Sequence, residues 1–130
     1  MGDVECASGG LETSLPMLFS SGVLANRIAL AQFVAVTSTN PAKLVGVDAQ
    51  KDTIVVGGDA GMVVWDETDT RVINGAEMQS RVDYSPYDGF KVTGWPSFTV
   101  SRGEVVLDQG EVTGVPGRGQ LLRRGSHSTI

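Results

Sequence analysis

The sequence predicts an α+β fold in which N-terminal helices precede a mostly antiparallel β-sheet. Up to about residue 46, apolar residues recur at helical spacing, whereas from residue 53 onward short apolar runs alternate with turn residues. The 17 glycines of the 130-residue chain fit many tight turns, and this length suffices for one buried core. We therefore divide the chain into a helical segment, 1–46, and a sheet segment, 47–130.

The first helix is predicted from Leu11, Leu15, Leu18 and Phe19, which share one helical face. Gly22 is the expected stop, because glycine accepts the left-handed conformation in which helices often end. The residues before Gly10 show no periodicity.

A second helix is predicted over 28–36, and it is apolar nearly all round. Such a helix needs cover on more than one side. Asn40 as N-cap and Pro41 as first helical residue predict a separate short helix, which Gly46 should end.

The central stretch reads as strand, turn, strand: 54–56, then 57–61, then 62–65. Residues 62–65 are apolar on both faces, so this strand is expected inside a sheet and not at its rim. The glycine-rich turn resembles a phosphate cradle, but no Lys-Ser/Thr pair and no helix follow it. A turn that connects strands is the better interpretation.

Later elements follow from alternation and from turn residues. Phe98 and Val100 lie on one face of a strand over 97–102, which Gly103 turns into a partner strand over 104–107. The other expected features are a polar turn at 66–69, a short strand at 70–73, an irregular stretch at 74–81, an ordered loop at 82–89, a turn at 109–110 and a glycine- and arginine-rich tail from Gly114.

Charge, apolar runs and cysteine content limit the kinds of partner and the cellular location that the sequence allows. A net charge of −5 with both signs mixed along the chain argues against nucleic acid or an anionic membrane as partner. No apolar run approaches membrane-spanning length, and the first ten residues lack a secretory signal pattern. With one cysteine no disulfide can form within the chain, so the expected location is the cytoplasm.

Candidate catalytic groups are few. Cys6 would need a base within hydrogen-bond reach, and the sole histidine, His127, stands at the opposite end of the sequence. An inert thiol is therefore the better interpretation. Asp66, Glu67 and Asp69 form an acidic cluster, but carboxylates in a polar turn are expected to be solvated rather than catalytic.

Two further sets of side chains have a functional and a structural interpretation. Three aromatic residues beside Pro or Gly could stack on a ligand, although such residues more often pack a loop onto a sheet or an interface. Three arginines near the end of the chain could bind phosphate, or belong to a solvated tail or a subunit contact. These residues are Tyr84, Tyr87 and Trp95, and Arg118, Arg123 and Arg124.

Several motifs resemble the C-terminal third of dihydropyrimidinases and hydantoinases, in collinear order over roughly residues 10 to 124. The central hairpin is one of them. The others are Gly10-Leu11-Glu12-Thr13-Ser14-Leu15-Pro16, the run from Phe33 to Leu44, Val82-Asp83-Tyr84-Ser85-Pro86-Tyr87-Asp88-Gly89, Val92-Thr93-Gly94-Trp95-Pro96, Ser101-Arg102-Gly103 and Gly117-Arg118-Gly119.

The resemblance implies a metal-dependent cyclic amidohydrolase, which opens a cyclic amide such as dihydrouracil or a hydantoin. Members have a (β/α)₈ barrel and a β-sandwich built from both chain ends, and the ligands of their two metals, usually zinc, lie upstream of the matched part. Residues 1–46 would then be a remnant of the last barrel helices, and 47–130 would be the C-terminal half of the sandwich.

Three stretches depart from the family pattern, and one of them is Glu77-Met78-Gln79-Ser80, which stands where the family commonly has a His-rich segment. The stretch 6–9 lacks the asparagine of the loop that contacts the substrate ring, and Ala60-Gly61-Met62 stands where the family usually has Ala-Asp-Leu. We therefore assign no substrate-binding role to residues 6–9.

The residue inventory leads to the same conclusion independently of the resemblance. A catalytic zinc ion needs about three protein ligands, mostly histidines, and one His with one Cys cannot supply them. The sequence therefore predicts no catalytic, cofactor-binding or metal-binding residue, and no cofactor in this chain, although the parent family carries two zinc ions.

The expected function is that of a C-terminal part of such an enzyme, inactive alone. A stand-alone interaction or oligomerisation module, and a hydrolase completed by a partner chain, remain alternatives. Because the family's N-terminal strands and its barrel are missing, we expect a homo-oligomer, a dimer in the favoured case, or a separate N-terminal barrel chain as partner.

Overall fold

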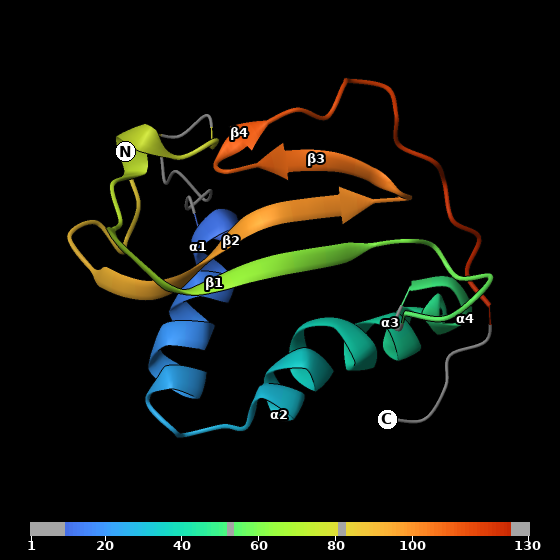
Figure 1. The fold of residues 1–130 in the computed structure, drawn as a ribbon, viewed down its shortest axis with the longest axis horizontal. Coiled ribbons are helices and arrows are strands. Elements are labelled where there is room, and N and C mark those ends of the chain that lie inside the picture. Colours follow the sequence, from blue (N-terminus) through green and yellow to red (C-terminus); the bar gives the residue numbers. More distant parts are fainter. Residues whose placement is uncertain (1–9, 52–53, 81–82, 126–130) are drawn as a thin grey trace, which may run out of the picture. The chain divides into compact units, whose positions relative to one another are not determined.

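The computed structural model describes residues 10–51, 54–80 and 83–125 (Figure 1). Helices come first and a four-stranded antiparallel sheet follows, so the predicted α+β class is confirmed. The elements in chain order are α1 Leu11–Leu18, η1 Phe19–Leu24, α2 Leu30–Val34, η2 Ala35–Thr39, α3 Asn40–Val45, α4 Asp48–Lys51, β1 Met62–Val72, η3 Gly75–Glu77, β2 Lys91–Ser101, β3 Glu104–Asp108 and β4 Glu111–Val112.

The sheet is a meander with strand order β1-β2-β3-β4. β3 is antiparallel to both β2 and β4. β1 is antiparallel to β2, since the N–H of Ile73 donates to the carbonyl of Phe90 and the hydroxyls of Thr70 and Thr93 are 3.0 Å apart. β1 is therefore an edge strand of this sheet, and the prediction that residues 62–65 lie inside it is wrong.

The chain forms two compact units, and each combines helix with parts of β1 and β2. Unit 1 comprises residues 1–28 and 67–95, and unit 2 comprises residues 29–66 and 96–130. The division into 1–46 and 47–130 stays a prediction about the parent architecture.

Unit 1 is built around Ile73, Val92 and Trp95, which are 1%, 2% and 6% exposed. The guanidinium of Arg71 lies over the Trp95 ring, 5.0 Å from its centroid, and adds a cation–π contact. The side chains that pack against this cluster are Met17, Met78 and Tyr87.

Two hydrogen bonds hold the first helical segment of unit 1 to the rest of that unit. The N–H of Thr93 in β2 donates to Oγ of Ser20 at 3.1 Å. The N–H of Gln79 donates to Oε2 of Glu12 at 2.8 Å. The segment is therefore fixed at both its beginning and its end.

The predicted helix stop at Gly22 is wrong by two residues, because η1 continues to Leu24. Gly22 is needed for another reason. A Cβ at this position would lie 3.1 Å from the side chain of Ile28, so the missing side chain lets the following segment fold back onto the last turn.

In unit 2, residues 30–45 form one uninterrupted helical segment that comprises α2, η2 and α3 (Figure 1). The predicted short helix is present as α3, which begins at Asn40, but Asn40 is not its N-cap, because Asn40 has helical angles, φ −67° and ψ −44°. Pro41 lacks an N–H and cannot continue an α-helical ladder without distortion. The wider turns of η2 precede it, and the N–H of Asn40 bonds to the carbonyl of Ala35.

The predicted end of this segment at Gly46 is confirmed. Gly46 has φ +70°, and its N–H donates to the carbonyl of Lys43. The N–H of Val47 donates to the carbonyl of Ala42, which completes a Schellman-type end. A short helix, α4, which we did not expect, follows.

The prediction of the central hairpin is correct for its turn and its second strand only. Residues 54–56 are not a strand; the chain turns there, and the N–H of Gly58 bonds to the carbonyl of Val55. Val56 is fully exposed, so the apolar run 54–56 does not correspond to a buried strand in this structure. The turn at 57–61 is confirmed, and β1 follows it without the predicted break at 66–69.

The hairpin turns of β2, β3 and β4 are confirmed. Arg102 and Gly103 both have positive φ, 52° and 77°, as a two-residue type I′ turn requires, and Gln109 and Gly110 repeat the pattern with 48° and 91°. The register shifts between Thr99 and Val100, which leaves Val106 as a bulge in β3.

Candidate functional site

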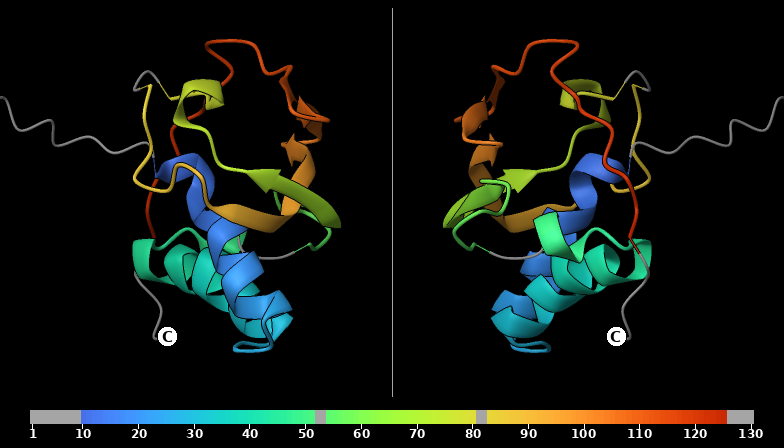
Figure 2. Two further views of the ribbon diagram at one scale, coloured as in Figure 1. Left: turned by 90° about the vertical axis from the view of Figure 1, so that its left-hand side faces the viewer. Right: turned by 90° about the vertical axis from the view of Figure 1, so that its right-hand side faces the viewer.

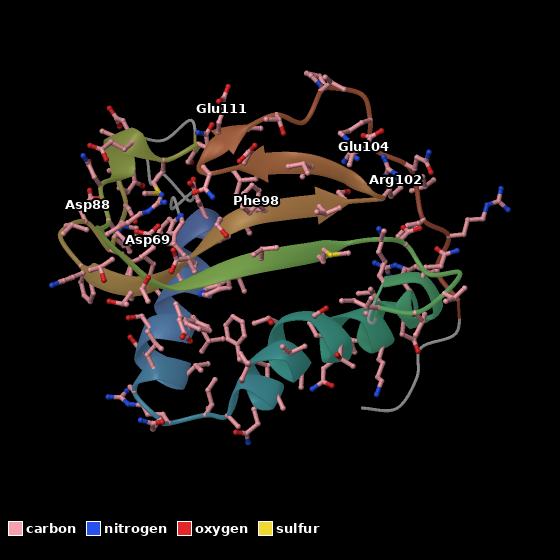
Figure 3. All side chains as sticks on the ribbon, viewed as in Figure 1. Asp69, Asp88, Phe98, Arg102, Glu104 and Glu111 are labelled. Atoms are coloured by element: carbon pink, nitrogen blue, oxygen red, sulfur yellow. The ribbon has the colours of Figure 1, made fainter. Side chains whose placement is uncertain are left out.

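The loop over 83–89 in unit 1 is ordered by one carboxylate, which confirms that part of the prediction for 82–89; Val82 lies outside the described residues. Oδ1 of Asp88, labelled in Figure 3, accepts the N–H of Gly75 at 2.5 Å, and Oδ2 accepts the N–H of Ser85 at 3.2 Å. The N–H of Tyr87 in turn donates to Oγ of Ser85, which is only 6% exposed. We call this arrangement the Asp88 knot.

The Asp88 knot leaves no space at Gly75. A Cβ there would lie 2.3 Å from the backbone carbon of Tyr84, so the two backbone segments touch directly. Beside it, Ile73 and Gly89 are joined by a backbone hydrogen bond of 2.9 Å. The knot therefore positions the loop against the core of unit 1, a role that the sequence did not reveal.

The aromatic residues of this unit divide between packing and exposure. Trp95 is 6% exposed, and Tyr87 packs on the same core cluster. The rings of Tyr87 and Phe90 are edge-to-face, with their centroids 6.1 Å apart. Tyr84 is 38% exposed. For Trp95 and Tyr87 the structure favours loop packing over ligand stacking.

Arg118 joins the tail of unit 2 to the β2–β3 hairpin. Its guanidinium donates to the carbonyl of Ser101 at 2.6 Å and to Oε2 of Glu104 at 2.9 Å. Arg102, beside Glu104 at the hairpin turn in Figure 3, donates in return to the carbonyl of Arg118. We call these contacts the Arg118 clamp. They engage the guanidinium that could otherwise bind phosphate, whereas Arg123 and Arg124 are exposed.

The same tail then returns to the end of the helical segment. Figure 2 shows it leaving β4 and running to the end of α3, where the N–H of Gly125 donates to the carbonyl of Gly46 at 2.7 Å. The tail is thus held at two places within unit 2.

The acidic cluster lies along β1 and not in a turn. Asp66 and Glu67 are exposed, and Asp69 is ion-paired with Arg71 at 2.7 Å. In the glycine-rich turn, Asp59 pairs with Lys51 at 2.6 Å. A strand follows this turn, so it is not a phosphate cradle that opens a helix.

The metal centre that the family resemblance implies does not fit the residues of this chain. Among residues 10–51, 54–80 and 83–125, no three His, Cys, Asp or Glu side chains lie close enough together to hold a metal ion. Cys6 and His127 lie outside these ranges, and the sequence contains no other cysteine or histidine.

Unit 2 exposes large apolar side chains on its helical segment and at the beginning of β1, and we call these eight side chains the apolar set of unit 2. Five belong to the helical segment and three to the beginning of β1. Their exposed fractions are 57% for Leu30, 45% for Val34, 52% for Val36, 63% for Leu44, 38% for Val45, 38% for Met62, and 48% each for Val63 and Val64.

Comparison with known proteins places the chain in a family. Residues 8–106 match the amidohydrolase family, and the chain belongs to it. No helix within the described ranges has the length and apolar character needed to cross a bilayer.

Within this family the chain is similar to hydantoinases and dihydropyrimidinases, as its motifs predict. It is 42% identical to a D-hydantoinase of Geobacillus stearothermophilus over 92% of its length, and 45% identical to an L-hydantoinase of Paenarthrobacter aurescens over 88%. The structure of a dihydropyrimidinase from Brevibacillus agri covers 89% of the chain with a TM-score of 0.85 and 39% identity.

The match covers only part of each relative. The chain spans about a quarter of the length of these proteins: 26% of the Geobacillus enzyme, and 25% of the Paenarthrobacter enzyme and of the Brevibacillus structure.

Proposed function

We propose that this chain is the non-catalytic C-terminal part of a hydantoinase-like cyclic amidohydrolase, and that it acts by assembly with other chains. The observation that carries the proposal is the collinear match of about nine tenths of this chain to about a quarter of a D-hydantoinase. In this interpretation the helices of units 1 and 2 are the last barrel helices, and β1 to β4 are half of a sandwich.

The chemistry of the side chains supports inactivity of the chain alone. Opening a cyclic amide by a metal-activated water needs ligands that hold the metal and leave one position open. One histidine and one cysteine in the whole sequence cannot build two such metal sites. The residues of the hydrolytic centre would therefore have to lie outside these 130 residues, in a barrel.

The apolar set of unit 2 supports assembly. Leu30 and Val36 are more than half exposed, in the stretch 28–36 whose pattern predicts cover on several sides. β1 adds a long edge strand of 11 residues, and exposed edges of this kind recruit other strands. We propose a homodimer when the chain is alone, and a complex with a metal-bearing barrel when one is present.

The first experiment measures assembly. Val64→Lys puts a charge on the edge strand, where Val64 is 48% exposed, and Val105→Lys puts the same charge on β3, where Val105 is 47% exposed. Sedimentation velocity over a concentration series should give a dimer for the wild type and for Val105→Lys. For Val64→Lys the dissociation constant should rise by about tenfold or more, since a half-exposed valine contributes about 1.5 kcal/mol when covered. A wild type that stays monomeric at high concentration would refute self-association.

The second experiment measures activity. The chain alone, with and without added zinc, should not hydrolyse dihydrouracil or hydantoin. Addition of a D-hydantoinase from which the matching quarter has been removed should restore hydrolysis if the chain completes a barrel. Stoichiometric metal binding and turnover by the chain alone would overturn the proposal. Self-association without restored hydrolysis would instead favour a stand-alone interaction module.

A further inference from the structure

Unit 1 contains two dipeptides that are prone to succinimide formation, Asn74–Gly75 and Asp88–Gly89, and the structure joins them. Glycine after Asn or Asp leaves the following backbone nitrogen sterically free to attack the side-chain carbonyl carbon. The nitrogen of Gly75 is held by the carboxylate of Asp88 at 2.5 Å, and the nitrogen of Gly89 is held by the carbonyl of Ile73 at 2.9 Å. Each potential nucleophile is therefore engaged by a partner on the facing segment.

We propose that Asn74 is a deamidation site that the Asp88 knot keeps closed in the folded protein. In the reaction the backbone nitrogen of Gly75 bonds to Cγ of Asn74 and loses its proton. The Cγ–Nδ2 bond breaks, and the amide nitrogen leaves as ammonia. One water molecule then opens the cyclic imide at either carbonyl and gives aspartate or isoaspartate, with no change of oxidation state.

The hydrogen bonds of both Gly75 and Asn74 oppose the first step, in which the Gly75 nitrogen attacks Cγ of Asn74. The Gly75 nitrogen is bound to a carboxylate, and its backbone lies against Tyr84 with no room to rotate. Nδ2 of Asn74 donates to Oε1 of Glu77 at 2.9 Å, and Oδ1 accepts the N–H of Ala76 at 3.3 Å. Attack therefore requires local opening, and its rate follows the population of the open state.

The side chain of Asn74 is nevertheless accessible to water, because Asn74 is exposed. The sequence supplies two internal references. Asn40 precedes Pro41, whose nitrogen carries no proton and cannot react in this way, and Asn26 precedes Arg27, which hinders attack. Asn74 is the only asparagine followed by glycine, so the modification should be specific to it.

The product would act on the fold of unit 1. Isoaspartate adds a methylene to the backbone between residues 74 and 75, at a place where Gly75 touches Tyr84 directly. Ile73, the least exposed core residue, precedes the site. Deamidation should therefore break the hydrogen bonds of the Asp88 knot and prevent them from forming again, so that the loop stays open after the modification.

The test is peptide mapping by mass spectrometry of the full chain, incubated at mildly alkaline pH. Asp88→Ala should raise the rate of amide-to-acid conversion at Asn74 by about tenfold or more, the factor that corresponds to losing one hydrogen bond to a charged group. Glu77→Ala removes only the bond to Nδ2 and should change the rate by less than about threefold, as expected for a weaker exposed contact. Asn26 and Asn40 should stay unmodified in each variant.

Val92→Ala is the matched control, since it weakens the core of unit 1 at a residue 2% exposed while keeping the Asp88 knot. If it accelerates deamidation as much as Asp88→Ala does, protection comes from global stability and the proposal is wrong. The proposal also fails if Asp88→Ala slows the reaction, since the carboxylate would then be acting as a base.

Should Asp88→Ala not fold, the wild type alone decides. Its Asn74 deamidation and the hydrogen exchange of the Gly75 amide should rise in parallel across low urea concentrations. A deamidation rate in native wild type equal to that in fully denatured chain would overturn the proposal.

Discussion

Removing the Arg118 clamp should loosen unit 2 by a measurable and predictable amount. Arg118→Met keeps much of the apolar stem of the side chain and deletes the guanidinium. The contacts to two partners are lost: the 2.6 Å bond to the carbonyl of Ser101, and the ion pair with Glu104, to which Nη2 and Nε donate at 2.9 and 3.2 Å. The bond from Arg102 to the carbonyl of Arg118 involves the backbone of Arg118 and stays available.

The two contacts differ in value. The Glu104 side chain is 71% exposed, so the ion pair contributes about 0–1 kcal/mol. The bond to the Ser101 carbonyl comes from a charged donor whose side chain is only 18% exposed, and such bonds contribute about 1.5–3 kcal/mol. The expected loss is therefore about 2 kcal/mol in the free energy of unfolding.

Urea unfolding at one fixed protein concentration measures this loss, because self-association would otherwise shift the midpoint. A loss of about 2 kcal/mol lowers the midpoint by about 1 M if the denaturant slope is about 2 kcal/mol per M. Arg118→Lys should fall between wild type and Arg118→Met, since lysine keeps the charge but not the planar fork.

The matched control is Arg123→Met, which removes the same group from an exposed position of the same tail. It should change stability by less than about 0.5 kcal/mol. The clamp would be refuted if Arg118→Met and Arg123→Met had the same midpoint. Arg118 would then belong to the solvated tail that the sequence also allowed.

Two further stability predictions follow from unit 2. Phe33 is 8% exposed, so Phe33→Ala should lower the free energy of unfolding by about 3–5 kcal/mol. Leu44 is 63% exposed, so Leu44→Ala should lower it by less than about 0.5 kcal/mol when the chain is monomeric. Thermal unfolding of the two variants measures the difference. Gly46→Ala should destabilise by more than about 1 kcal/mol, because φ is +70° and the new Cβ would lie 2.6 Å from the carbonyl oxygen of Gly125. Gly57→Ala, with φ +91° but open space around it, should cost less, and equal losses for both glycines would contradict the contact with Gly125.

The turns were predictable because their chemistry is local. Arg102-Gly103, Gln109-Gly110 and Gly46 need positive φ, and the glycines that accept this conformation are visible in the sequence. The course of the chain at these points follows from residues within one turn of each other. The strand predicted over 97–102 was visible through local alternation in the sequence, although β2 begins six residues earlier, at Lys91.

The continuation of the helical segment through Asn40 and Pro41 was not predictable by the same rules. Proline at a first helical position and proline after a wide turn leave the same local signature: a residue without an N–H, so that no backbone donor is left unpaired there. The structure uses the second solution, with the Asn40 N–H bonded to Ala35 and the segment unbroken. The hydroxyl of Thr37, bonded to the carbonyl of Phe33 at 2.7 Å, satisfies another backbone group nearby.

The Asp88 knot and the Arg118 clamp lay beyond sequence reasoning for a different reason. Their partners are distant in the chain: Asp88 binds Gly75, 13 residues earlier, and Arg118 binds Ser101, 17 residues earlier. A carboxylate in a Tyr-Asp-Gly stretch and an arginine between two glycines look like ordinary loop residues until the fold brings their partners to them.

The failed prediction for residues 62–65 bears on the proposed function. Their hydropathy is that of a strand covered on both faces, yet Val63 and Val64 are each 48% exposed on an edge strand. Hydropathy patterns reflect burial in the state in which a protein works, whereas these exposed fractions are those of a single chain. The same discrepancy occurs at the helical segment, where Leu30 and Val36 are exposed despite the all-round apolar pattern of residues 28–36. β1 and the helical segment of unit 2 thus both have sequences typical of buried elements, although their apolar side chains are exposed. A neighbouring chain that covers both elements would account for the two discrepancies together.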